Sequence, residues 1–235
     1  MNRLMETISS WEDPLTYLSR KPTQDFAKGR IIYGPEHPAD RLFLLVRGRV
    51  KVNTTRDDGY ETIGRLISPE GLFGEAVLVG GRPTESAVTL EPATVMSWSR
   101  DEIEHQTERE PRLGLALAQY LVRQCINLQE RIESMAVHKT PERVMVALIQ
   151  LADQMGTLQP DGATRLPSFT HRTVAEYIGT SREIVTYQMN RLRRLGLIRY
   201  TRRYIDVMAP GMVEALRQQG IQLQRPEPAL RQAGV

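Results

Sequence analysis

Arg182 and Glu183 stand side by side in the C-terminal third of the chain, and their side chains carry groups that can read DNA bases. A guanidinium can donate two hydrogen bonds to guanine, and a carboxylate can accept one from cytosine. Each good contact of this kind contributes roughly 1–3 kcal/mol of discrimination against a wrong base. Ser181, Thr186 and Tyr187 are polar neighbours that would share the same helix surface. These five residues are therefore predicted to form a DNA-binding surface, with Arg182 and Glu183 as its base readers.

Two short helices joined at Gly179 would present this surface. Thr170 is a suitable N-cap for a first helix over Arg172–Ile178, which Gly179 would end. Thr180 and Glu183 have the spacing of a capping box at the start of the second helix, so Glu183 has a competing structural interpretation as a cap partner. The buried stripe of the second helix is expected at Val185, Met189, Leu192 and Leu195. Two such helices form a helix-turn-helix, whose second helix fits the DNA major groove.

Basic residues around these helices are candidates for phosphate contacts. Two β-prone runs, over 197–200 and 204–207, flank a basic turn that contains Arg203 and predict a wing hairpin. Arginines at such a turn contact phosphates, which positions a protein on DNA without reading its sequence. His171 and Arg172, at the start of the first helix, are predicted to lie near the phosphate backbone as well.

The charge distribution supports a polyanionic partner. The whole chain carries a net charge of only +3. Residues 164–206 contain nine arginines against three acidic residues, a local charge of +6, so the remainder is mildly acidic. A basic module on a mildly acidic body is typical of proteins that bind nucleic acid. On charge alone, a solvated arginine-rich face remains the alternative interpretation.

The N-terminal part of the chain reads as a series of short β-strands. The runs are rich in β-branched residues and are separated by glycine, proline and aspartate turns, a pattern typical of an antiparallel sandwich or barrel. We expect strands over Gly29–Tyr33, Leu42–Arg47, Arg49–Thr54, Glu61–Ile67, Glu85–Leu90 and Ala93–Ser99.

A long helix is predicted after these strands. Ser99 and Glu102 have capping-box spacing for a short helix, and Pro111 suits the first turn of the next one, which no proline interrupts before Pro141. Apolar residues recur along it at alternating spacings of three and four, as in a coiled coil. This dimer seam consists of Ala118, Leu121, Cys125, Leu128, Ile132 and Met135. A partner helix is favoured, and packing against the helix's own domain stays open as the alternative.

The rest of the chain completes the expected domain organisation. A helix is predicted from Thr140 to about Gly156, followed by a polar turn over 157–164 and, after the wing, a last short helix from Pro210. The tail is expected to be poorly ordered. The expected boundaries are 1–109 for the strand domain, 110–137 for the long helix, 138–221 for the helix-turn-helix domain and 222–235 for the tail.

Several classes of protein lack support in the sequence. No apolar run approaches the roughly 20 residues that span a bilayer, and the N-terminus lacks the pattern of a secretory signal, so a cytoplasmic protein without a membrane partner is expected. Cys125 is the only cysteine, which excludes an intrachain disulfide and a cysteine-held iron–sulfur cluster. The four histidines are scattered without metal-ligand spacing, so no metal and no cofactor are predicted. The common hydrolase motifs are absent, so an enzyme is not expected.

Four segments together resemble the cyclic AMP receptor protein/FNR superfamily of bacterial transcription regulators. They are Lys28–Ile32, Pro38–Val52, Gly71–Glu75 and Gly179–Glu183, and the resemblance extends over nearly the whole chain. It implies an α+β fold with an N-terminal antiparallel β-roll of the cyclic-nucleotide-binding jelly-roll type, a long dimerisation helix and a C-terminal winged helix-turn-helix. It also implies a homodimer that binds near-palindromic double-stranded DNA and contacts RNA polymerase at the polar turn over 157–164.

By position, the resemblance assigns base reading to Arg182 and Glu183, which implies half-sites similar to TGTGA. The nucleotide-responsive members have a third base-reading arginine where this chain has Tyr187. A tyrosine cannot make the bidentate contact with guanine. The resemblance therefore does not predict how one base pair of each half-site is recognised.

The residues that match the family's effector pocket depart from the pattern that binds cyclic AMP. Gly74 and Glu75 are retained, and in the family they meet the phosphate and the ribose. The arginine–serine pair that should follow is Glu85 and Ser86 here. A carboxylate beside the cyclic phosphate replaces attraction by repulsion.

The family's adenine contacts on the long helix also differ. The usual threonine–serine pair is Leu128 and Gln129 here, and Leu128 has no hydrogen-bonding group. We therefore predict a DNA-binding activator that uses neither cyclic AMP nor another small-molecule effector. The alternative is a regulator whose β-roll binds cyclic AMP or another small molecule.

Overall fold

The structure, a computed structural model, describes residues 12–36, 40–55, 59, 61–80 and 84–221. By their contacts the residues fall into two compact units, Met1–Glu130 and Arg131–Val235. Strands and helices occur in both units, so the α+β fold class predicted from the sequence is confirmed. The predicted tail over 222–235 and part of the segment Pro38–Val52 lie outside the described residues.

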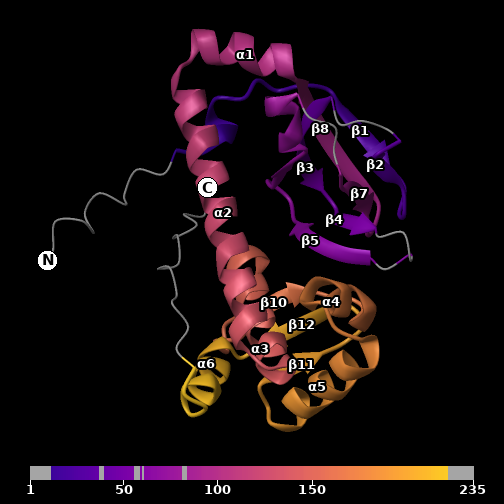
Figure 1. Cartoon of the computed structure of the whole chain (residues 1–235), viewed down its shortest axis with the longest axis vertical. Coiled ribbons are helices and arrows are strands. Elements are labelled where there is room, and N and C mark those ends of the chain that lie inside the picture. The colour runs from indigo at the N-terminus through magenta and orange to yellow at the C-terminus, as the bar shows by residue number, and fades with distance from the viewer. Residues whose placement is uncertain (1–11, 37–39, 56–58, 60, 81–83, 222–235) are drawn as a thin grey trace, which may run out of the picture. The chain divides into compact units, whose positions relative to one another are not determined.

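The first unit contains two four-stranded antiparallel sheets (Figure 1). Their strand orders are β1-β8-β3-β6 and β2-β7-β4-β5. Leu45 and Val95 from one sheet share an apolar cluster with Val52 and Ala87 from the other, so the two sheets enclose one core. The strands are β1 (Thr23–Phe26), β2 (Ile31–Tyr33), β3 (Arg41–Arg47), β4 (Val50–Thr55), β5 (Glu61–Ile67), β6 (Leu72–Phe73), β7 (Ser86–Thr89) and β8 (Ala93–Ser99).

The six predicted strands are all present, with ends that shift by at most two residues. The sequence did not indicate β1 or β6. β1 reads Thr-Gln-Asp-Phe, which lacks an apolar alternation, and three of its four residues are exposed. β6 has only two residues, so its pairing with β3 depends on the fold and leaves no local pattern.

Two helices follow β8. Two short 3-10 turns lie earlier in the chain, η2 (Pro14–Thr16) before β1 and η3 (Glu75–Val79) between β6 and β7. α1 (Arg100–Arg109) begins at the predicted capping box: Ser99 Oγ accepts from the Glu102 amide at 3.2 Å, and a Glu102 carboxylate oxygen accepts from the Ser99 amide at 2.8 Å. The long helix is α2 (Arg112–Val137), and its first turns pack with α1 on an apolar cluster around Trp98.

The second unit combines one four-stranded sheet with four helices and the last turns of α2. The sheet has the strand order β11-β12-β10-β9, and α3 contributes eight buried residues to the core. The elements are α3 (Thr140–Met155), β9 (Thr157–Leu158), β10 (Thr164–Pro167), α4 (His171–Ile178), α5 (Arg182–Arg194), β11 (Ile198–Tyr200), β12 (Tyr204–Val207) and α6 (Ala209–Arg217). The predicted polar turn over 157–164 is therefore a β9–β10 hairpin. None of the described helices is long and apolar enough to cross a bilayer.

Candidate nucleic-acid interface

The predicted helix-turn-helix consists of α4 and α5. Thr170 caps α4, because its Oγ1 accepts a hydrogen bond from the amide three residues later at 3.0 Å. Gly179 follows α4 with a φ of 74°, a left-handed conformation that residues with a side chain rarely adopt. This glycine turns the chain from α4 into α5, as the sequence predicted.

The N-cap of α5 is Ser181, so the predicted capping box between Thr180 and Glu183 is wrong. The Thr180 amide donates to the Ala175 carbonyl, which keeps Thr180 in the turn that ends α4. Ser181 Oγ accepts from the Ile184 amide at 3.4 Å. Glu183 is then the second residue of the helix, so it does not close a capping box, and its carboxylate instead hydrogen-bonds to the N-cap Ser181. Hydrogen bonds from its own amide and from Ser181 lower the pKa of Glu183, so its exposed carboxylate is ionised at neutral pH.

The outward face of α5 carries the candidate base readers. Arg182 and Glu183 are exposed at its first turn, and Tyr187, about one turn later, is exposed as well. Residues three, four or seven positions apart lie on the same face of a helix. Several exposed residues have this spacing from Tyr187 and therefore lie on its face of α5. Those that the sequence prediction did not include are Ile184, Arg191 and Arg194.

The buried face of α5 differs from the prediction at one position. Val185, Met189 and Leu192 are buried as predicted, and Gln188 is buried with them. Leu195 is exposed, because α5 ends at Arg194 and the chain turns away at the C-cap.

His171 and Thr186 connect α4 to α5. His171 Nδ1 lies 2.9 Å from Thr186 Oγ1, and that hydroxyl also donates to the Arg182 carbonyl at 2.8 Å. The hydroxyl has a single proton, so when it donates to the carbonyl, His171 is the donor from Nδ1. Burial and the Arg182 charge lower the pKa of His171, which favours the neutral ring. The Tyr200 ring meets the imidazole edge-on at 5.9 Å between centroids, so the wing, α4 and α5 converge at this histidine.

β11 and β12 form the predicted wing hairpin. Thr201 Oγ1 accepts hydrogen bonds from the amides of Arg203 and Tyr204, at 3.1 and 3.3 Å, which stabilises the turn. Arg202 and Arg203 are exposed at its tip. The turn therefore presents two guanidinium groups to solvent.

Ion pairs neutralise part of the basic module. Asp206 is buried, and its carboxylate accepts two hydrogen bonds from Arg165 at 2.7 and 2.9 Å and one from Arg199 at 3.4 Å. Arg199 also pairs with a second carboxylate on the turn before β10. Arg172 pairs with Glu176 one turn along α4 at 2.7 Å. Besides the ion-paired Arg172 and Arg199, the exposed arginines on α5 and the wing are Arg182, Arg191, Arg193, Arg194, Arg202 and Arg203.

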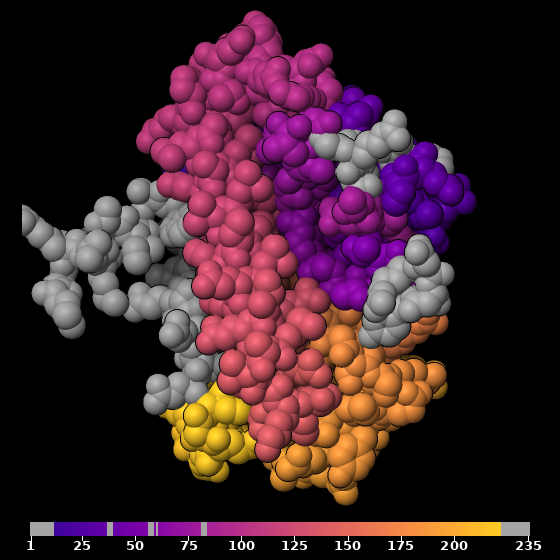
Figure 2. Space-filling view, in the orientation of Figure 1, coloured from indigo at the N-terminus to yellow at the C-terminus, as the bar shows by residue number. Residues whose placement is uncertain are grey.

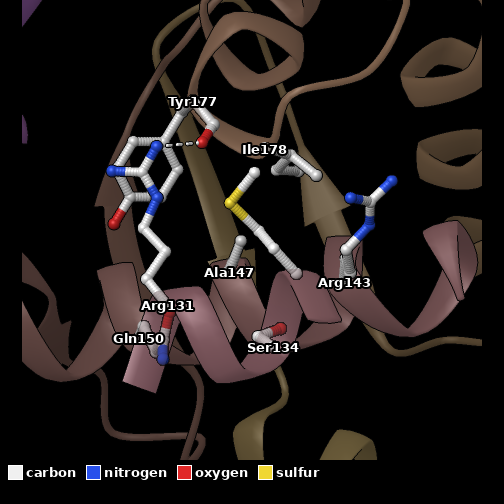
Figure 3. A pocket seen from close by; sticks show the side chains of 8 residues that line it. Arg131, Ser134, Arg143, Ala147, Gln150, Tyr177 and Ile178 are labelled. Carbon is white, nitrogen blue, oxygen red and sulfur yellow. Dashed lines mark hydrogen bonds between the residues drawn. The ribbon is translucent and has the colours of Figure 1, made fainter. Parts of the chain in front are cut away.

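The last turns of α2 are attached to α4. Arg131 Nη2 donates to the Tyr177 carbonyl at 2.6 Å, and the guanidinium stacks over the Tyr177 ring at 4.2 Å from its centroid (Figure 3). The carbonyls at the C-terminal end of a helix lack partners within the helix, so a cation there stabilises α4. The Met135 methyl lies 3.4 Å from the position that a Cβ on Gly179 would occupy, so part of Met135 packs on the turn of the helix-turn-helix.

A small cavity lies beside these residues, between α2, α3 and α4 (Figure 3). Its volume is about 20 Å³, and its lining includes Ser134, Arg143 and Ala147. This volume accommodates about one water molecule. The cavity is therefore a packing gap and too small for an organic effector.

An apolar stripe runs along α2. Of the six predicted seam residues, Ala118, Cys125, Leu128, Ile132 and Met135 are exposed and Leu121 is half-buried. Further exposed apolar side chains extend the stripe beyond the prediction, namely Leu115, Val122 and Ile126. Figure 2 shows side chains of α2 at the surface of the face in view. A stripe of this kind is a surface that a partner helix can cover.

Glu75 is held by an arginine within the first unit. Arg65, on β5, donates to both carboxylate oxygens of Glu75, at 2.7 and 2.9 Å, and both side chains are largely buried. Burial lowers the pKa of Arg65, whereas the charge of Glu75 raises it. The net result is a pKa above the usual value for arginine. Gly74 has a φ of 84°, and a Cβ there would lie 2.8 Å from the Arg41 carbonyl, so glycine is required. The residues that match the family's pocket thus form a turn closed by an ion pair.

Glu85 lies beside a buried tyrosine. The Tyr33 hydroxyl donates to a Glu85 carboxylate oxygen at 3.0 Å, and burial together with the Glu85 charge raises the pKa of Tyr33 far above its usual value. The Tyr120 hydroxyl donates to the backbone carbonyl at the start of β6, and burial raises the pKa of Tyr120 to about 12. The remaining pocket positions are Ser86, half-buried on β7, and Leu128 and Gln129, exposed on α2. Among the residues that the structure describes, no group of three or more histidine, cysteine, aspartate or glutamate side chains could hold a metal ion.

Two family models match the chain. One is described as a cyclic nucleotide-binding domain and matches residues 23–110. The other is described as a Crp-like helix-turn-helix domain and matches residues 142–221. The first match covers the two β-sheets and α1, and the second covers α4, α5 and the wing.

Curated relatives and a solved structure agree with these matches. The transcriptional regulator SdrP of Thermus thermophilus is 30% identical, over 76% of this chain and 86% of the relative. The CRP-like cAMP-activated global transcriptional regulator of Mycobacterium tuberculosis is 29% identical, over 74% of this chain and 79% of the relative. The structure of FixK2 from Bradyrhizobium japonicum superposes with a TM-score of 0.75 over 88% of this chain and 100% of FixK2, at 17% identity, which shows a shared fold.

Proposed function

Because the chain belongs to the CRP/FNR family of transcription regulators, we propose that it is a homodimeric activator that binds near-palindromic DNA without cyclic AMP. The family consists of DNA-binding regulators and not of enzymes. One observation carries the proposal: Arg182 and Glu183 are exposed on the first turn of α5, the second helix of the helix-turn-helix. That turn is the part of such a helix that lies nearest the base edges.

The base readers define the expected DNA site. Arg182 and Glu183 together suit a G·C pair, as in half-sites similar to TGTGA. Tyr187 stands where the nucleotide-responsive relatives carry an arginine, so we infer that one base pair of each half-site is read differently. Two helix-turn-helix modules in a two-fold dimer would reach half-sites about 34 Å apart, one turn of DNA.

The apolar stripe of α2 supports the homodimer. Five of its six predicted seam residues are exposed, and the monomer gains nothing from apolar side chains in water. Covering them with the same helix of a second copy would bury the stripe and place two recognition helices on one DNA molecule.

The ion pair of Glu75 supports independence from cyclic AMP. In the family this carboxylate meets the ribose, whereas here both of its oxygens accept hydrogen bonds from Arg65. Glu85, where the family has an arginine, would repel a cyclic phosphate. The second candidate is an effector-dependent regulator, favoured by the match to the cyclic nucleotide-binding domain and by the Mycobacterium tuberculosis relative, which is described as cAMP-activated.

Gel-shift and calorimetric titrations test the function and its independence from cyclic AMP together. The protein is expected to retard a palindromic TGTGA-like duplex equally with and without cyclic AMP, and calorimetry is expected to show no cyclic AMP binding at micromolar concentrations. Retardation that requires cyclic AMP, or micromolar affinity for it, would establish the effector-dependent candidate instead. Failure to bind any duplex specifically would count against the regulator itself.

We also infer that the hairpin of β9 and β10 contacts RNA polymerase. Leu158 is an exposed aliphatic residue at this hairpin, where it contributes little to the core. Leu158→Ala is expected to lower transcription severalfold in a purified system with RNA polymerase, while its affinity for promoter DNA stays unchanged. Undiminished transcription by this variant would exclude the contact.

A further inference from the structure

Ile184 is an aliphatic side chain on a helix face whose other residues are charged or polar. It is the third residue of α5, and 42% of its surface is exposed. Its amide donates to Ser181 Oγ, so the backbone that carries it is anchored at the N-cap. Tyr187 and Arg191, three and seven positions later, lie on the same face and are exposed as well.

The major groove offers one apolar group to such a side chain. The base edges there present hydrogen-bond donors and acceptors, except for the C5-methyl group of thymine. An isoleucine that contacts this methyl removes apolar surface of both groups from water, and the gain follows the area buried. A polar side chain in the same place would find no partner on the methyl group. Ile184 is therefore chemically matched to a T·A pair and not to a G·C pair.

We propose that Ile184 is a specificity-determining residue that reads the methyl group of a thymine next to the G·C pair contacted by Arg182 and Glu183. This inference rests on the proposed function, since it requires α5 to enter the major groove. Ile184 follows Glu183 directly on the first turn, so a neighbouring base pair is within its reach. The Tyr187 ring, exposed on the same face, would shield the contact from water.

Replacing thymine by deoxyuridine tests the contact, because it removes only the methyl group. Each T·A pair of a palindromic TGTGA-like duplex is replaced in turn, in both half-sites, and affinities are measured by fluorescence anisotropy at fixed salt. The native protein is expected to lose about fourfold in affinity per half-site at one of these pairs, the effect of one buried methyl group. Ile184→Ser is expected to bind the thymine and deoxyuridine duplexes equally at that pair.

Two variants serve as controls. Ile184→Val keeps an aliphatic side chain and is expected to retain the preference for thymine. Leu195→Ser removes another exposed aliphatic residue of the same module, located beyond the end of α5, and is expected to retain the preference fully. Circular dichroism of each variant should match that of the native protein, since neither side chain belongs to the buried face of α5.

The outcomes separate this inference from the proposed function. If the native protein binds the duplex specifically but has the same affinity for thymine and deoxyuridine at every pair, the role of Ile184 is wrong and the function stands. A thymine preference that survives in Ile184→Ser also overturns the role. If no duplex is bound specifically, the proposed function fails and this inference fails with it.

Discussion

Replacing Arg182 by alanine is expected to weaken binding to a TGTGA-like palindrome by roughly 30-fold or more while leaving binding to random DNA nearly unchanged. The exposed guanidinium at the start of α5 is placed to donate two hydrogen bonds to a guanine, and a two-fold dimer would make this contact twice. Random DNA offers phosphates at every site, so most of its affinity does not depend on base contacts. Anisotropy titrations with both duplexes at the same salt concentration measure the two effects.

Arg203→Ala provides the contrasting control. Arg203 is exposed on the wing turn, where it can contact phosphate and no base edge is expected. This variant is expected to weaken binding to both duplexes alike and to reduce the slope of log affinity against log salt by about one for each phosphate that Arg203 no longer neutralises. Equal decreases in affinity for specific and random DNA in Arg182→Ala would contradict its role in base reading.

Introducing a charge into the predicted seam, as in Ile132→Asp, is expected to convert the dimer into a monomer. Burying an aspartate against its symmetry mate would leave two carboxylates without partners in an apolar interface. A monomer holds only one half-site, so affinity for the palindrome is expected to fall by about 100-fold or more. Sedimentation velocity gives the oligomeric state, and anisotropy gives the affinity.

Val137→Asp is the matched control for the seam. Val137 is 71% exposed on the same helix, compared with 68% for Ile132, but it lies outside the predicted heptad positions. It is expected to leave both the dimer and the affinity unchanged. An Ile132→Asp variant that sediments as the native protein does would show that α2 is not the dimer seam.

The parts of the fold that local signals determine could be predicted from the sequence. Thr170 and Gly179 mark the ends of α4 because a hydroxyl that caps a helix and a left-handed glycine act within one turn of the chain. The N-cap of α5 was misplaced by one residue, because the Thr180 amide is used by a carbonyl of the preceding helix. A sequence pattern does not show which of two adjacent hydroxyl residues is left to form the cap.

Features that depend on distant partners could not be predicted. Arg65 and Glu75 are ten residues apart, and nothing in their spacing indicates that a strand and a 3-10 turn bring them together. Arg165 and Arg199 entered the sequence analysis only through the net charge of the module, and no local pattern indicated that the buried Asp206 binds both. β10 was missed because a Thr-Arg-Leu-Pro strand is stable only between its neighbours β9 and β12.

The wing is anchored at its base and free at its tip. The buried Asp206 and the Thr201 hydroxyl hold the hairpin, whereas Arg202 and Arg203 extend from a turn that neither of them stabilises through its side chain. Substitutions at these two positions are therefore expected to change the strength of DNA binding at almost no cost in folding stability. If the wing contacts DNA as proposed, a lineage carrying this protein can tune how firmly the regulator holds its promoters, one surface mutation at a time, without first having to evolve a more stable protein.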